Sequence, residues 1–113
     1  MISRYLNKEI EVTMDRPLGS KHPKYDYEYP INYGFIENTM QGDGEEIDAY
    51  CIGPKEALKK FTGICVAYIK RSDDPEDFKL IVVDKNNIYV TDSETLKAVH
   101  FQEQFFSPTV MRS

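Results

Sequence analysis

Short apolar segments of strand length, separated by polar connections, run along most of this chain and limit what it can fold into. One segment alternates apolar and polar residues, the period of a half-buried strand, and the others are rich in aromatic and β-branched residues. The candidate strands are 9–14, 29–36, 47–52, 63–69, 78–83 and 88–90. Because strands and helices do not alternate, we predict a mainly β (α+β) fold, an OB-like five-stranded antiparallel barrel with a C-terminal helix.

The connections between the strands differ in kind. Segment 15–28 combines prolines, a glycine and many charges, which predicts a long surface loop. Segment 55–61 places its apolar residues on one side of a short helical turn. Thr91 and Glu94 have the spacing of a capping box, so we predict a helix over roughly residues 93–105.

Length and charge restrict the class of protein. A chain of 113 residues predicts a single domain, 1–113, and its 19 acidic against 14 basic residues disfavour binding to nucleic acid. The N-terminal residues lack the apolar stretch of a signal peptide, and no window has the length of a membrane span, so we expect a cytoplasmic protein with no membrane partner. Cys51 and Cys65 each lie in an apolar run, which predicts reduced thiols in the core.

The acidic turn that begins at Asp43 is the strongest local motif. Asp43, Glu45 and Asp48 stand at relative positions 1, 3 and 6, and Gly44 permits the sharp turn that aims them into one space. Closely packed carboxylates repel unless cations neutralise them, so the motif indicates divalent metal binding, with solvated turn acids as the alternative. An EF-hand loop is excluded because Asp48 and Pro54 occupy the positions of its glycine and its bidentate glutamate.

A second acidic cluster, 73–77, precedes Lys79. It is either a charged hairpin tip or a functional site, because Asp77 and Lys79 share one face of a strand and can hold a metal and a phosphate side by side. Tyr29 and Tyr33 are candidate phenolic donors to an oxyanion, although aromatic residues near a barrel mouth more often belong to the core.

The segment YPINYGFIENTMQGDGEEIDAYCIGP resembles the signature of the family I soluble inorganic pyrophosphatases, a YPxNYG segment before D-x-D-x-x-D. EDFKLIVV is similar to the family segment with an aspartate and a lysine two residues apart, and HFQEQFF resembles its C-terminal helix. The resemblance implies an OB-like barrel that splits pyrophosphate into two phosphates, with several Mg²⁺ ions, or Mn²⁺ as a substitute, bridging the substrate and an attacking water.

The resemblance also implies residue roles. Glu45 takes the place of the aspartate that orients or deprotonates the water, and Tyr33 and Lys79 join it as catalytic candidates. The implied phosphate contacts are Lys21, Tyr29, Tyr33 and Lys79. The implied metal ligands are Asp43, Asp48, Asp77 and either Asp73 or Asp74.

Several departures from the family pattern keep other functions open. Glu45 is one methylene longer than the family aspartate, and a Tyr-Lys pair that contacts phosphate falls on Phe105 and Phe106. Lysine replaces arginine at Lys21, and Arg16 or Lys24 could compensate for a missing cation. The alternatives are a hydrolase of another phosphoanhydride and a non-catalytic barrel that binds a phosphorylated ligand or a protein. Members of the family often form homo-oligomers, so self-association stays open.

Overall fold

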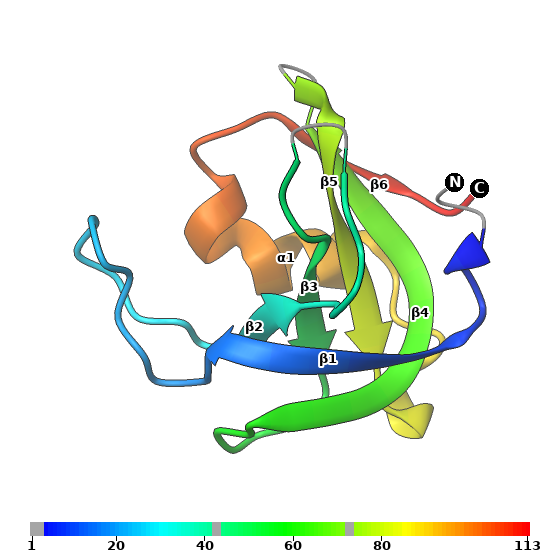
Figure 1. The fold of residues 1–113 in the computed structure, drawn as a ribbon, viewed down its shortest axis with the longest axis horizontal. Helices are drawn as coiled ribbons and strands as arrows, with labels where there is room; N and C mark the ends of the chain where they lie inside the picture. The colour runs from blue at the N-terminus through cyan, green and yellow to red at the C-terminus, as the bar shows by residue number, and fades with distance from the viewer. Residues whose placement is uncertain (1–3, 42–43, 72–73) are drawn as a thin grey trace.

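A ring of five strands forms the body of the molecule, and one helix packs on its outside (Figure 1). The computed structural model describes residues 4–41, 44–71 and 74–113. The strands are β1 (Glu9–Arg16), β2 (Asn32–Phe35), β3 (Asp48–Ile52), β4 (Lys60–Arg71), β5 (Asp74–Val83) and β6 (Pro108–Met111). The helices are the short 3₁₀ helix η2 (Lys85–Asn87) and α1 (Asp92–Glu103).

The strand order is β1-β2-β3-β5-β4-β6, and an additional pairing of β1 with β4 closes the first five strands into a ring. Strand β1 pairs with β2 through Thr13 to Arg16 and with β4 through Glu9 to Thr13. Gly34 permits the close approach of β1 to β2, because a Cβ at this position would lie 2.0 Å from the backbone oxygen of Thr13. Strand β6 adds to the outer part of β4.

Two apolar clusters lie on opposite faces of the ring wall. One contains Val12, Cys51, Cys65 and Val82, and the other contains Tyr50, Ile69, Ile81 and Val99 of helix α1. Strand β3 and residues 80–83 at the end of β5 contribute alternate residues to both clusters and are therefore buried on both faces, as their nearly continuous apolar sequence indicates. Helix α1 begins with the predicted capping box between Thr91 and Glu94.

The predicted OB-like barrel is confirmed, with differences in its details. The pairing of β3 with β5 is parallel, whereas an antiparallel barrel was predicted, and β6 is an additional strand that follows the helix. Segment 88–90 is not a strand, because the side chain of Asn87 donates to Asp84 over 2.6 Å and the chain turns there. Segment 55–61 is not a helical turn: it runs irregularly into β4.

Three further expectations concern the loop, the thiols and the membrane. Residues 17–28 form a loop that projects from the ring at the left of Figure 1, although one backbone bridge joins Lys21 to Glu28. Cys51 and Cys65 are free and buried, as predicted, and burial raises the pKa of each thiol, to about 12 for Cys51 and about 11 for Cys65. In the part of the chain that the structure describes, no helix has the length and apolar character to cross a bilayer.

Candidate active site

The centre of the candidate site is a lysine held between two aspartates on the helix-covered side of the ring. The parallel register places Asp48 of β3 directly beside Lys79 of β5, and Asp77 lies two residues earlier on the same face of β5. The Nζ of Lys79 is 2.8 Å from Oδ1 of Asp77 and 3.3 Å from Oδ2 of Asp48. The hydroxyl of Tyr33, from β2, donates to the same Asp48 oxygen over 2.7 Å. Four predicted residues thus meet at one place.

A buried arginine extends this cluster toward the helix. Arg71, at the end of β4, donates from Nε and Nη2 to the carboxylate of Glu103 over 2.9 and 2.7 Å, and its Nη1 reaches Asp77 at 3.2 Å. Glu103 is 1% exposed and also accepts from the hydroxyl of Tyr50. The guanidinium carbon of Arg71 lies 3.7 Å from the ring centre of Phe106. The network therefore joins the end of helix α1 to the wall of the ring.

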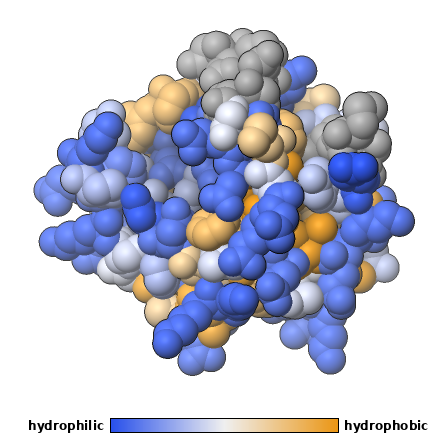
Figure 2. All heavy atoms as spheres, in the orientation of Figure 1, coloured by the Kyte–Doolittle hydropathy of each residue, from blue (hydrophilic) through white to orange (hydrophobic). Residues whose placement is uncertain are grey.

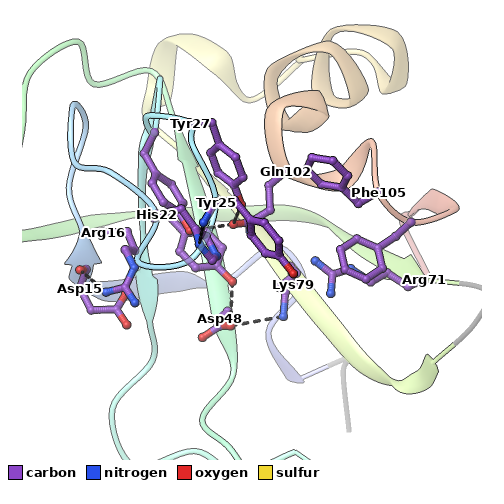
Figure 3. A pocket seen from close by; sticks show the side chains of 13 residues that line it. Asp15, Arg16, His22, Tyr25, Tyr27, Asp48, Arg71, Lys79, Gln102 and Phe105 are labelled. Carbon is purple, nitrogen blue, oxygen red and sulfur yellow. Dashed lines mark hydrogen bonds and ion pairs between the residues drawn. The ribbon is translucent and has the colours of Figure 1, made fainter.

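Two adjoining cavities open onto this cluster and share Asp15, Asp48 and Lys79. The smaller, of about 300 Å³, is lined mainly by polar groups, among them Glu45 and Asp77. The larger, of about 410 Å³, is bounded by charged residues and by aromatic rings. Figure 3 shows Asp48, Lys79 and Arg71 along one side of the larger cavity, with Tyr27 and Phe105 on the other. Figure 2 shows that hydrophilic side chains cover most of the molecular face drawn in Figure 1.

Burial and charge set the protonation of the surrounding groups. Burial, reinforced by the negative charge of Asp48, raises the pKa of Tyr33 well above 10, so its phenol stays a hydrogen-bond donor. Burial also raises the pKa of Asp15, and the nearby Asp48 raises it further against the opposing effect of Arg16. Burial lowers the pKa of the Arg71 guanidinium, but Glu103 and Asp77 outweigh it and raise the pKa above its usual value.

Of the other predicted site residues, some line a cavity, one does not, and some lie outside the described part of the chain. Tyr29 lines the larger cavity, where its hydroxyl donates to Gln102 of helix α1 over 2.7 Å, and Glu45 is an exposed residue that lines the smaller cavity. Lys21 is exposed and is not among the described residues that line either cavity. Asp43 and Asp73 lie outside the described residues, and the side chain of Asp74 is outside them as well.

Asp15, Arg16 and Arg71 are among the cavity residues that were not assigned to the site from the sequence. Arg16, which was left undecided, lines the larger cavity, whereas Lys24 is not among its described lining residues. Asp15 lines both cavities, and Arg71 lines the larger one. The position of Asp15 at the end of an alternating strand and before Pro17 was an available signal. No local pattern marks Arg71, because its partner Glu103 is 32 residues away.

Comparisons with known proteins agree with this architecture. The family profile described as inorganic pyrophosphatase matches residues 5–109. An inorganic pyrophosphatase of Saccharolobus solfataricus is 29% identical over 86% of this chain and 74% of its own length. One of Ralstonia nicotianae is 30% identical over 68% of this chain and 52% of its own length, so this chain spans about half of that relative.

Solved structures show the same fold. The crystal structure of an inorganic pyrophosphatase from Ehrlichia chaffeensis has a TM-score of 0.70 at 23% identity and covers 91% of this chain and 84% of its own. An inorganic pyrophosphatase from Helicobacter pylori has a TM-score of 0.65 at 17% identity, over 96% and 84% of the two chains. The family profile spans nearly the whole sequence, and the solved structures have the same fold as this chain. The chain therefore belongs to the inorganic pyrophosphatase family of hydrolases.

Proposed function

We propose that this chain hydrolyses pyrophosphate to two phosphates with the help of divalent cations. A water attacks one phosphorus, the bond from that phosphorus to the bridging oxygen breaks, and the bridging oxygen leaves with the second phosphate. The observation that carries the proposal is the cluster of Asp48, Asp77 and Lys79, with Tyr33 beside it, at the junction of two cavities. It brings carboxylates that suit a cation and an ammonium that suits a phosphate onto one wall.

The donor chemistry of the smaller cavity fits a hard divalent cation. Its acidic side chains are Asp15, Glu45, Glu46, Asp48 and Asp77, which offer only oxygen ligands. Among the side chains that the structure describes, those of residues 4–41, 44–71 and 77–113, no three histidine, cysteine or acidic groups already converge closely enough to hold an ion. We infer that Asp48 and Asp77 supply ligands, together with Asp43 and with Asp73 or Asp74.

Mg²⁺ is the cation we propose, in several copies, with Mn²⁺ as a substitute. When bound, such cations polarise phosphoryl oxygens and lower the pKa of a coordinated water. The two Lys79 contacts use one oxygen of Asp48 and one of Asp77. The second oxygen of Asp48 is used neither by Lys79 nor by Tyr33, which leaves an acceptor for the ion.

We assign the remaining roles from position. Lys79 and Tyr33 bind phosphate oxygens as donors, and the raised pKa of Tyr33 supports this role. Glu45 holds or deprotonates the attacking water, because it is a carboxylate that lines the smaller cavity together with Asp48 and Asp77. Tyr29 supports the phosphate site from the larger cavity, and Arg16, which lines it, is better placed to contact phosphate than the exposed Lys21.

A phosphate-release assay with pyrophosphate, across concentrations of Mg²⁺ and Mn²⁺, tests the proposal. We expect release that requires the cation and that is lost on Lys79→Ala. The matched control is Lys60→Ala, because Lys60 is paired with Glu11 at a surface position where both side chains are more than half exposed. No cation-dependent phosphate release would contradict the proposed function.

A further inference from the structure

Aromatic side chains from two distant segments meet at the mouth of the larger cavity. We call His22, Tyr25, Tyr27, Phe105 and Phe106 the aromatic rim; the first three belong to the projecting loop, and the last two follow helix α1. Tyr25 and Phe105 are stacked with ring centres 6.1 Å apart, and Tyr27 and Phe105 are 6.2 Å apart. The loop and the helix end thus build one aromatic surface at the cavity.

Two rings of the aromatic rim are largely open to solvent. Tyr25 is 60% exposed and Phe105 is 61% exposed, and both line the larger cavity. Exposed aromatic surface gathered at one place is typical of a binding site for another apolar or planar group. Pyrophosphate has no such group, so its hydrolysis does not account for the rim.

The rim is continuous with the charged wall of the same cavity. Phe106 covers the guanidinium of Arg71 at 3.7 Å, and Arg71 is joined through Asp77 to Lys79. A ligand that reaches from Lys79 to Tyr25 therefore meets cations at one end and aromatic rings at the other. The cavity volume of about 410 Å³ lies in the range of sites that hold an organic molecule.

We propose that the aromatic rim binds the base of a nucleoside 5′-diphosphate whose phosphates lie at the Lys79 cluster, and that this nucleotide is a second substrate. The inference rests on the proposed function. Water attacks the terminal phosphorus, the bond from it to the bridging oxygen breaks, and the products are a nucleoside monophosphate, orthophosphate and one proton. Asp15 and Asp48 also line the cavity, so the diphosphate enters with its divalent cation, which reduces their repulsion.

Stacking of a base on aromatic side chains improves binding by roughly five- to hundred-fold, and any base can contribute it. A purine offers the larger ring, so ADP should be the better substrate and UDP the weaker one. Tripolyphosphate has the anhydride but no base, and it should gain nothing from the rim. The aromatic rim therefore predicts a preference for ADP over UDP and tripolyphosphate, which the phosphate groups alone do not predict.

The experiment measures kcat/KM for pyrophosphate, ADP, UDP and tripolyphosphate in saturating Mg²⁺, with calorimetry of ADP binding as a second readout. Tyr25→Leu and Phe105→Leu should each lower the ratio of the ADP value to the pyrophosphate value by roughly five-fold or more, and both should weaken ADP binding. Tyr89→Leu is the matched control, because Tyr89 is 90% exposed and does not line the larger cavity, and it should leave the ratio unchanged.

Three outcomes overturn the proposal. If the wild type releases phosphate from pyrophosphate but neither hydrolyses nor binds ADP, the nucleotide inference is wrong while the proposed function stands. If neither substrate is hydrolysed, the proposed function fails, and this second substrate fails with it. If Tyr25→Leu and Phe105→Leu leave the ratio unchanged but alter the molecular mass in light scattering, the rim is a contact between copies of this chain.

Discussion

Replacing Arg71 by methionine should destabilise the fold by about 3–5 kcal/mol, because it leaves a buried carboxylate without its cation. Glu103 is 1% exposed and would lose two hydrogen bonds, of 2.9 and 2.7 Å, and would keep only the one from Tyr50. Hydrogen bonds to charged groups contribute about 1.5–3 kcal/mol each, so the two estimates agree. Asp77 also loses its contact with Arg71, but it keeps a cation, because Lys79 still contacts it at 2.8 Å.

Urea denaturation followed by circular dichroism at neutral pH measures this change as a shift in the midpoint at constant slope. The matched control is Arg112→Met, because the pair of Arg112 with Asp92 is exposed and should contribute less than about 1 kcal/mol. The double variant Arg71→Met with Glu103→Leu should recover most of the loss, because apolar residues can replace a buried ion pair at little cost. A loss below about 1 kcal/mol for Arg71→Met, or a double variant no more stable than the single one, would refute the reasoning.

Three further predictions concern the site and its loop. Glu45→Gln should lower turnover of pyrophosphate by roughly 10²–10⁴-fold if the Glu45 carboxylate is the general base. It should weaken metal binding less than Asp48→Asn does. Near-full turnover at saturating Mg²⁺ would mean that another group is the base. Lys79→Ala should lower the melting temperature, because Lys79 is 6% exposed and separates two carboxylates, and Mg²⁺ should restore part of the loss in a thermal melt. Burial, with help from Arg16, lowers the pKa of His22 below 6.5 in the folded state. As pH drops below about 6.5, His22 is therefore protonated in the unfolded chain before it is protonated in the folded one, and stability should fall. An NMR titration that gives His22 a pKa above 6.5 would contradict this.

Strands β1 to β5 were predictable because each one carries its own periodicity or apolar run, whatever it pairs with. Pairing direction was not, because alternation along a strand is the same in parallel and antiparallel ladders. The parallel contact of β3 with β5 arises because β4 intervenes in the chain and lies on the other side of β5. Strand β6 has no clear alternation of its own, and it forms because β4 extends beyond β1 and offers a free ladder.

The candidate site was predictable only in part, for a similar reason. Asp48, Asp77 and Lys79 belong to recognisable local motifs, and the register of β3 and β5 then brings them together. Arg71 and Glu103 pair across 32 residues, and nothing in the local sequence of either indicates that its charge is buried. The aromatic rim depends on how the projecting loop folds toward helix α1, a long-range contact that local patterns do not specify.

The closure of β1 onto β4 also affects how the protein behaves among other chains. A strand with an unpaired edge can recruit a strand from another molecule and start aggregation. In the described part of the chain, each of the five ring strands has a neighbour on both sides, and β6 has only β4. That remaining edge is four residues long and begins with Pro108, which lacks a backbone N–H. Intermolecular strand addition therefore has little backbone to pair with, and replacing Pro108 should make this edge more prone to recruit other strands.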